Sequence, residues 1–167
     1  NYTGERIRIS PLAFIARAVI KALKKYPNFN SSIDTKNNKL IYKKYFHIGF
    51  AVDTPHGLMV PKIRNADNLG LKEIFEELKR VSKLCKELKI EKKEFFGGSI
   101  TISSLGGIGG NFFTPIINPP EVAILGVGKT FEKIRKVDGQ FITRKMLPVS
   151  LSYDHRVIDG AEGARFC

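Results

Sequence analysis

The chain of 167 residues is 43% hydrophobic and 26% charged, which suggests one globular domain with a substantial core and excludes a disordered chain. Its net charge of +12 reflects either a lysine-rich soluble surface or an anionic partner. Because the sequence has no dense basic block and no nucleic-acid recognition motif, we predict no nucleic-acid partner. A cofactor that carries phosphates would fit the charge. The sequence predicts no disulfide framework and no metal site, because its two cysteines, Cys85 and Cys167, are distant and its three histidines are scattered. Arg17 and Lys21 interrupt the longest apolar run, so we expect no membrane span. We expect a cytoplasmic protein.

The first predicted element is a helix that begins at Ser10-Pro11, an N-cap followed by a proline in the first turn, and ends before Tyr26-Pro27. We expect a loop over residues 30–38 and extended structure over residues 39–54, with a break near Tyr45. The turn TPHG then leads into a further strand, which makes a hairpin. A second, amphipathic helix is predicted over residues 71–88, with an apolar stripe formed by Ile74, Leu78, Val81, Cys85 and Leu88.

The second half of the chain reads mainly as strands, with a short helix after Asp159. Strands are predicted over residues 97–105, 121–128, 130–137 and 140–153. Asp138-Gly139 forms a tight hairpin turn between the last two. This order of elements predicts an α+β sandwich on a mostly antiparallel or mixed sheet, with flanking helices, rather than a doubly wound fold.

Two glycine-rich stretches resemble nucleotide-binding motifs without fitting them. GVGKT, residues 126–130, has Ala123 where a P-loop needs its first glycine, and the residues after it alternate like a strand. GGIGGN, residues 106–111, is followed by Phe112 where the dinucleotide fingerprint needs glycine. Neither predicts a nucleotide site, although the second loop can line a site because glycine lets a ligand approach the backbone.

Polar residues cluster after the last predicted strand, in the stretch LSYDHRVIDGAE. His155 is a candidate general base near neutral pH, activating a thiol or hydroxyl that a substrate brings. Asp159 has an alternative role, because D-x-x-E is the pattern of a capping box that starts a helix. Asp154 and Arg156 are ordinary loop charges or an ion pair that shapes the loop.

Hydroxyl side chains end the strand that contains TISS. Alternation places Thr101 and Ser103 on one face and Ser104 on the other. A serine there either caps the strand end or donates a hydrogen bond to a developing oxyanion.

These stretches together resemble the catalytic domain of dihydrolipoamide acyltransferases, the E2 components of 2-oxo acid dehydrogenase complexes. The signature D-H-R-x-x-D-G of that family is present from Asp154 to Gly160, and four further stretches are similar to it in the same order: KYPNFNSSI, HIGFAVDTPHGLMVPKI, GGSITISSLGGIGG and FTPIINPPEVAILGVGK. The resemblance implies a chloramphenicol-acetyltransferase-like fold and a trimeric building block.

The resemblance also implies a reaction, the transfer of an acyl group from a dihydrolipoyl thiol to the thiol of coenzyme A. His155 would take the proton from coenzyme A, and Ser103, with Ser104 as the competing assignment, would steady the oxyanion. Asp159 would shape the histidine loop. In this family the histidine and the serine of one site come from neighbouring subunits.

Within the family, the chain is most similar to bacterial pyruvate dehydrogenase acetyltransferases, which implies acetyl as the acyl group. Succinyl or branched-chain specificity, or a mainly structural scaffold, are the alternatives. The implied partners are further copies of the chain, as homotrimers in a 24-subunit core, and the E1 and E3 components; the lipoyl group would be carried on a domain outside this chain. Residues 1–167 are expected to be one catalytic core domain truncated at both ends, without a lipoyl or subunit-binding domain.

Overall fold

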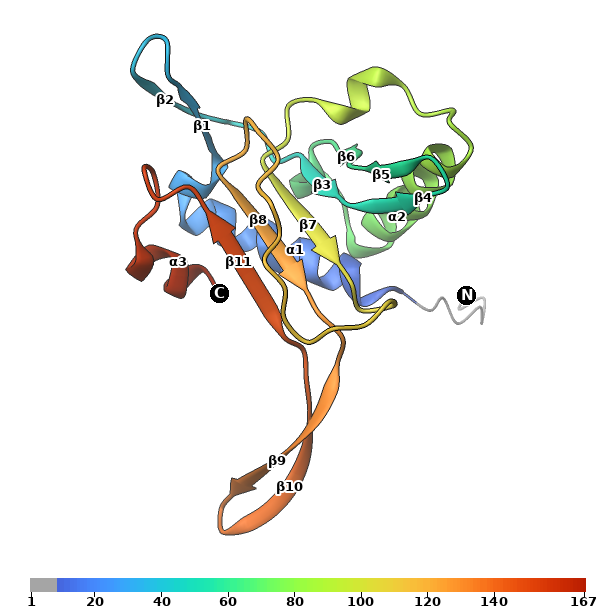
Figure 1. Ribbon diagram of the computed structural model, residues 1–167, viewed down its shortest axis with the longest axis vertical. Helices are drawn as coiled ribbons and strands as arrows, with labels where there is room; N and C mark the ends of the chain where they lie inside the picture. Colours follow the sequence, from blue (N-terminus) through green and yellow to red (C-terminus); the bar gives the residue numbers. More distant parts are fainter. Residues whose placement is uncertain (1–8) are drawn as a thin grey trace, which may run out of the picture.

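A five-stranded mixed sheet forms the centre of the molecule in the computed structural model, which describes residues 9–167 (Figure 1). Its inner pairs are parallel and its two outer pairs are antiparallel. The strands, in spatial order, are β11 (Val149–Tyr153), β8 (Ala123–Val127), β7 (Ile100–Ser104), β3 (Ile48–Phe50) and β6 (Lys62–Ile63). The predicted α+β class with a mixed sheet is therefore confirmed.

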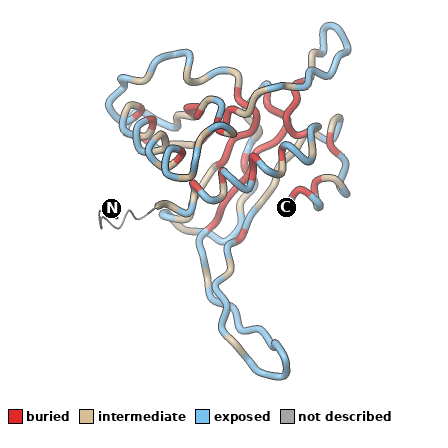
Figure 2. The backbone as a smooth tube through the Cα atoms, turned by 180° about the vertical axis from the view of Figure 1, so that it is seen from behind, coloured by how far each residue is buried: buried red, intermediate tan, exposed pale blue. Residues whose placement is uncertain are grey.

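Helix α1 (Pro11–Lys25) begins and ends where the sequence predicts. The Ser10 hydroxyl accepts a hydrogen bond from the Leu12 N–H at 3.3 Å, and Pro11 occupies the first turn. The buried side of this helix packs against the sheet and forms much of the core (Figure 2), through Ala13, Ala16, Val19, Ile20 and Leu23. A 3-10 turn, η1 (Pro27–Asn30), follows.

Helix α2 (Leu71–Lys86) is amphipathic as predicted, with Ile74, Val81 and Cys85 buried. The prediction was wrong at its end. Leu88 lies beyond the helix with a φ of +54° and is 55% exposed, because the chain turns into the left-handed region and leaves the apolar stripe. Two further 3-10 turns are η2 (Ala66–Asn68) and η3 (Lys92–Phe95).

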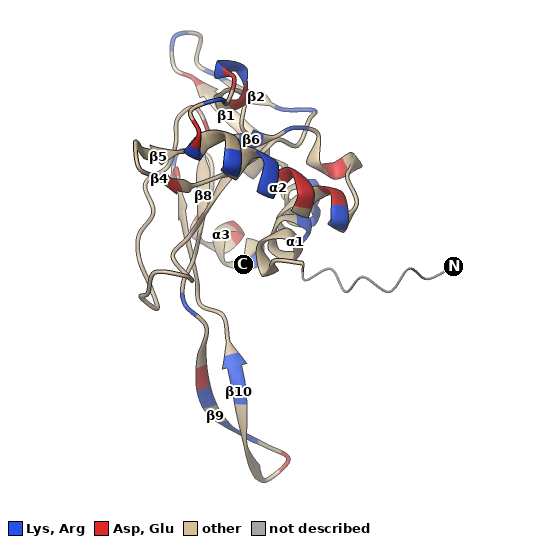
Figure 3. Cartoon of the chain, turned by 90° about the vertical axis from the view of Figure 1, so that its right-hand side faces the viewer, with Lys and Arg blue, Asp and Glu red and all other residues tan. Residues whose placement is uncertain are grey.

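The last helix, α3 (Gly160–Phe166), lies on the same side of the sheet as α1 and α2 (Figure 3). Its Phe166 ring stacks on Phe29 with 4.0 Å between ring centroids. This contact ties the C-terminal end of the described chain to the segment after α1.

Two short hairpins flank the main sheet. β1 (Ser31–Asp34) pairs with β2 (Lys39–Tyr42), so the loop predicted over residues 30–38 was wrong for its first half. Polar residues dominate this segment, and the pairing depends on backbone hydrogen bonds that side-chain hydrophobicity does not reveal. β4 (Val52–Thr54) pairs with β5 (Gly57–Met59) as predicted, but Pro61, which has no N–H, separates β5 from β6.

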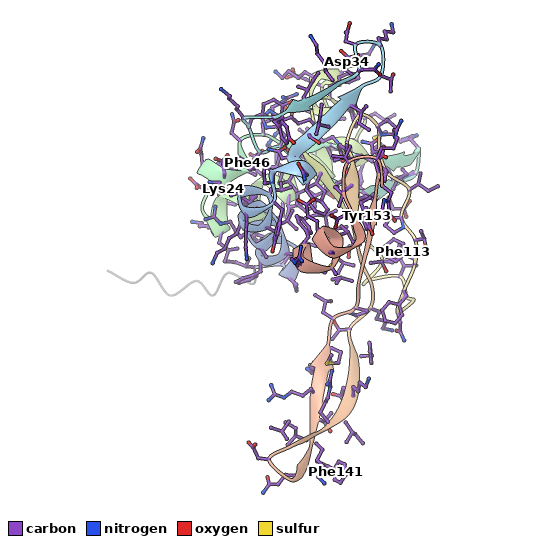
Figure 4. The ribbon with its side chains drawn as sticks, turned by 90° about the vertical axis from the view of Figure 1, so that its left-hand side faces the viewer. Lys24, Asp34, Phe46, Phe113, Phe141 and Tyr153 are labelled. Atoms are coloured by element: carbon purple, nitrogen blue, oxygen red, sulfur yellow. The ribbon has the colours of Figure 1, made fainter. Side chains whose placement is uncertain are left out.

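A long hairpin of β9 (Phe131–Val137) and β10 (Gln140–Met146) projects from the body of the molecule. Asp138 and Gly139 form its turn with φ values of +49° and +82°, as the sequence predicts. The hairpin exposes apolar side chains, including Phe141 near its tip, which is 76% exposed (Figure 4).

The register of the strands gives the main sheet two distinct faces. The helix face, covered by the helices, includes Ile48, Phe50, Ile100, Ile102, Leu125 and Val127. The loop face, crossed by residues 105–121, includes Gly49, Lys62, Thr101, Ser103, Gly126 and Ser150. The two serines at the end of β7 therefore serve different faces.

Candidate active site

Ser103 lies on the loop face at the end of β7, as alternation predicts. It is half-buried, and its neighbours across the sheet are Gly126 on β8 and then Ser150 on β11. Gly126 carries no side chain, so the space beside the Ser103 hydroxyl is left to another group.

The ring of Phe113 occupies that space. A Cβ placed on Gly126 would come within 2.9 Å of the Phe113 Cζ, so the ring lies directly on this glycine. Figure 4 places Phe113 on the side of the sheet away from α1. A small cavity of about 280 Å³ opens beside the ring, lined also by Thr114, Ser150 and Ser152. The site at Ser103 thus has an aromatic wall.

Ser104 has a different environment on the helix face. Its Oγ accepts a hydrogen bond from the Gly106 N–H at 3.4 Å, which helps to close the strand end. It also borders a groove of about 830 Å³ between α2 and the sheet, where Phe50, Leu78 and Ile102 form part of the wall. The hydroxyl that caps the strand end is therefore that of Ser104.

His155 lies in a tight turn after β11, exposed to solvent. The turn is anchored by the Asp154 N–H, which donates to the Val122 carbonyl at 2.8 Å, and by the N–H groups of Val157 and Ile158, which both donate to the Asp154 carbonyl. Ile158 is fully buried beneath it. The imidazole is thus presented on a rigid turn.

Asp154 and Arg156 form the ion pair that was one of the two predicted possibilities. The guanidinium donates to both carboxylate oxygens, with 2.6 Å from Nη2 to Oδ2 and 2.9 Å from Nε to Oδ1. These hydrogen bonds lower the pKa of Asp154 below its usual value. The pair stabilises the turn while leaving His155 free of either partner.

Asp159 is the N-cap of α3, as predicted. Its side chain accepts a hydrogen bond from the Glu162 N–H at 2.7 Å. The second half of the predicted capping box does not form, because the Glu162 carboxylate instead accepts two hydrogen bonds from the Asn28 side-chain amide. Asp159 therefore fixes the end of the histidine turn through the helix it starts.

One chain does not bring Ser103 and His155 together. Ser103 is level with Ser150 on β11, two strands away. β11 continues for three residues from Ser150 to Tyr153, and His155 lies beyond that end. Strand geometry gives about 10 Å along the sheet and about 10 Å across it, so the two residues are separated by about 14 Å or more. Neither can act on the atom that the other contacts in the same chain.

A buried polar cluster on the loop face was not predicted. Lys62 Nζ lies 2.5 Å from Glu121 Oε1, and the Thr101 hydroxyl donates to Glu121 Oε2 at 2.6 Å. All three residues are at most 5% exposed. The available signal was an acidic residue directly before the uninterrupted apolar run of β8.

The described residues 9–167 contain no group of three or more His, Cys, Asp and Glu side chains placed to hold a metal ion. Over the same residues, no helix is both long enough and apolar enough to cross a membrane.

A five-stranded mixed sheet with helices on one side is a fold that this chain shares with a known acetyltransferase. The structure superposes on chloramphenicol acetyltransferase with a TM-score of 0.60 over 93% of this chain and 72% of that one, at 15% identity, which shows the shared fold. The sequence profile described as "2-oxoacid dehydrogenases acyltransferase (catalytic domain)" matches residues 1–167. The chain belongs to this family.

Several relatives are close. The dihydrolipoyllysine-residue acetyltransferase component of the pyruvate dehydrogenase complex of Cupriavidus necator is 54% identical over 96% of this chain, and that of Haemophilus influenzae is 53% identical over 96%. The chain spans 29% and 28% of their lengths. A solved structure of the Azotobacter vinelandii dihydrolipoamide acetyltransferase has a TM-score of 0.91 and 50% identity, covering 96% of this chain and 66% of that one.

Proposed function

We propose that this chain is the catalytic core of an acyltransferase that moves an acetyl group from an S-acetyl-dihydrolipoyl arm to coenzyme A. The observation that carries the proposal is the spacing of three polar residues on a shared fold. The Azotobacter structure is described as an investigation of a serine, a histidine and an asparagine in the catalytic mechanism, with the histidine 52 positions after the serine and the asparagine four positions later. Ser103, His155 and Asp159 have the same spacing here.

His155 would act as the general base. The ordinary pKa of a thiol is about 8.5, so a neutral imidazole can take the proton of coenzyme A near neutral pH. The thiolate then attacks the carbonyl carbon of the acetyl thioester. This attack forms a tetrahedral intermediate. Collapse of the intermediate breaks the bond between the carbonyl carbon and the dihydrolipoyl sulfur, which receives the proton from the imidazolium and leaves as a thiol.

Ser103 would donate its hydroxyl hydrogen to the oxygen that becomes negative in the tetrahedral intermediate. Such a donor acts mainly in the transition state, and removing one typically costs about 10²–10³ in rate. Asp159 would keep the histidine turn in place. The relative has an asparagine at this spacing, and an amide can also accept the cap hydrogen bond, so this role needs no ionised carboxylate.

The site would form between copies of the chain, because the strand register separates Ser103 from His155 within one copy. Large exposed apolar side chains on the segment that follows β7 support such a contact: Ile108 is 76% exposed, Phe112 is 71% and Ile116 is 89%. We infer a homotrimer as the active unit. A relative of 49% identity is described as the cubic core of the pyruvate dehydrogenase multienzyme complex, which supports a larger 24-subunit core with E1 and E3 components as partners.

The acetyl group fits the wall beside Ser103. The ring of Phe113 lies on Gly126, the residue paired with the proposed oxyanion donor, and would limit the size of the acyl group there. The curated relatives are named as acetyltransferases, in agreement with this size limit. Succinyl and branched-chain donors are the alternatives that an acyl-donor panel separates.

Coenzyme A would enter as a substrate, and its phosphates suit a chain of net charge +12. The lipoyl group would arrive on a separate domain. The relatives are bacterial, and we infer a bacterial cytoplasm as the setting. A scaffold without catalysis is the competing function, and the histidine turn argues against it because a scaffold has no need of an exposed, rigidly held imidazole.

The test mixes the protein with S-acetyldihydrolipoamide and coenzyme A and follows acetyl-coenzyme A. We expect turnover by the wild type and loss of turnover in His155→Ala, with both proteins eluting as the same oligomer. A wild type that gives only the uncatalysed rate, or one that elutes as a monomer, contradicts the proposal.

A further inference from the structure

The buried cluster of Lys62, Thr101 and Glu121 crosses the sheet beneath the proposed site. Lys62 starts on the edge strand β6, and its side chain extends over β3 to reach Thr101 on β7, where Nζ lies 3.3 Å from the hydroxyl oxygen. The ammonium also contacts Glu121, which lies two residues before β8. One cluster therefore joins three chain segments and crosses a fourth, β3.

Two glycines make this path possible. A Cβ on Gly49 would lie 2.6 Å from the Thr101 hydroxyl oxygen and 2.7 Å from Lys62 Nζ. A Cβ on Gly98 would likewise overlap the Glu121 carboxylate. The surrounding backbone thus accommodates the polar cluster closely, and any other residue at either glycine would displace it.

The cluster touches both elements that present the proposed site residues. Thr101 shares the loop face of β7 with Ser103, two residues further along. Glu121 adjoins Val122, whose carbonyl accepts the hydrogen bond that anchors the His155 turn through Asp154. A shift at the cluster would therefore move Ser103 and the base of the histidine turn together.

Stability alone is a weak reason for such a cluster. Removing two charges from water is costly, and buried ion pairs can often be replaced by apolar side chains without loss of stability. A fully hydrogen-bonded network has a second effect, because directional bonds fix the orientation of their members where apolar packing fixes only volume. The Thr101 hydroxyl, held between an ammonium and a carboxylate, has such a fixed orientation.

We propose that Lys62, Thr101 and Glu121 are a positioning network for acyl transfer, which sets the placement of Ser103 on β7 and of the His155 turn beside β8. The inference rests on the proposed function, in that Ser103 and His155 are the groups it positions. None of the three residues contacts the reacting atoms. Their effect is expected in kcat, because misplacing a catalytic group by about 1 Å can cost about 10²-fold in rate.

The test compares an apolar replacement with conservative and remote controls. The triple variant Lys62→Met, Thr101→Val, Glu121→Leu removes all three polar groups together, so neither member of the Lys62–Glu121 pair is left without the other. We expect it to keep the wild-type oligomer and thermal midpoint, to retain the KM for coenzyme A within about twofold, and to lose about tenfold or more in kcat. Thr101→Val should lose kcat as well, whereas Thr101→Ser, which keeps the hydroxyl, should restore it.

Lys72→Met with Glu76→Gln is the matched control, because it removes an exposed ion pair on α2. A triple variant that assembles and has the wild-type kcat overturns the positioning network. Failure of all the cluster variants to fold also overturns it, because that result assigns the cluster to folding alone. An inactive wild type instead defeats the proposed function. In that case hydrogen exchange of the backbone amides tests the positioning network without an activity assay. Unchanged exchange at the Ser103 and Asp154 amides in Thr101→Val overturns the network.

Discussion

Ser103 and His155 lie at opposite ends of one sheet. Ser103 is the last but one residue of β7. His155 follows β11, which is antiparallel to β8 and therefore finishes where β7 and β8 begin. Each chain thus offers a serine at one end and a histidine at the other. If both groups serve one reaction, each site must combine the serine of one copy with the histidine of another.

Mixed assemblies test this division directly. Ser103→Ala and His155→Ala should each be nearly inactive alone, but hetero-oligomers formed by co-expression should regain activity, because some interfaces join an intact serine to an intact histidine. Random mixing in a closed trimer restores about a quarter of the sites. The measurement is the acetyl transfer rate per chain after purification by two affinity tags.

The control for mixing is co-expression of His155→Ala with itself under two tags, which should stay inactive. Hetero-oligomers that form at the expected ratio and yet show no recovery would mean that both groups of a site come from one chain, against the strand register.

The two serines at the end of β7 should differ sharply. Ser103→Ala removes the proposed oxyanion donor and should lower kcat about 10²–10³-fold, with the KM for coenzyme A nearly unchanged. Ser104→Ala removes a hydroxyl that accepts from the Gly106 N–H on the other face, so its rate should stay within a few-fold of wild type. Steady-state kinetics of both variants decide the assignment, and the reverse order of effects would move the role to Ser104.

Local patterns were sufficient for much of the fold. Ser10 and Pro11 start α1, Asp138 and Gly139 turn the long hairpin, and Asp159 caps α3, since each depends on a few adjacent residues. Alternation along β7 was also sufficient to separate Ser103 from Ser104. These features need no knowledge of distant partners.

Features that depend on distant neighbours could not be predicted from local patterns. The parallel pairing of β7 with β3 joins residues about fifty positions apart, and its register decides which side chains meet. The lysine of the cluster reaches Glu121 only because Gly49 and Gly98 leave room for the two side chains, a coincidence of segments that are distant in the sequence. Likewise, the distance between Ser103 and His155 follows from the register of β7, β8 and β11 together.

The acyl preference should respond to Phe113. Phe113→Ala removes the ring from Gly126 and opens space beside Ser103, so larger acyl donors should gain relative to acetyl. Size discrimination in an apolar pocket is typically about 10–200-fold, which sets the scale of the expected change in the kcat/KM ratio of isobutyryl to acetyl donors. Phe141→Ala, near the exposed tip of the long hairpin, is the control, and an unchanged ratio in Phe113→Ala would remove this ring from the acyl site.

Asp159 should tolerate asparagine but not alanine. Asparagine can still accept from the Glu162 N–H, whereas alanine loses the cap at a cost of about 1 kcal/mol in the free energy of unfolding. Asp159→Asn should therefore keep kcat within a few-fold, and Asp159→Ala should lower both the thermal midpoint and kcat. A large loss of kcat in Asp159→Asn at normal stability would instead show that the carboxylate charge takes part in the reaction.

Lys43 should make stability depend on alkaline pH. Burial lowers the pKa of its ammonium from 10.5 to about 8, an effect that outweighs the attraction of Glu121, while the ammonium donates to the carbonyl groups of Ser31 and Gly98. Because the pKa is lower in the folded chain, the unfolded chain binds more protons between about pH 8 and 10.5. Stability attributable to this group is therefore lowest below pH 8 and rises through that window.

The measurement is the difference in thermal midpoint between the wild type and Lys43→Met, taken from pH 7 to pH 10. This difference should be constant up to about pH 8 and should then shift in favour of the wild type as its lysine loses the buried charge. Lys44→Met, at the exposed neighbouring position, is the matched control for general alkaline effects. A flat difference across the range would show that the Lys43 ammonium is solvated in the folded protein despite its position between β2 and β3.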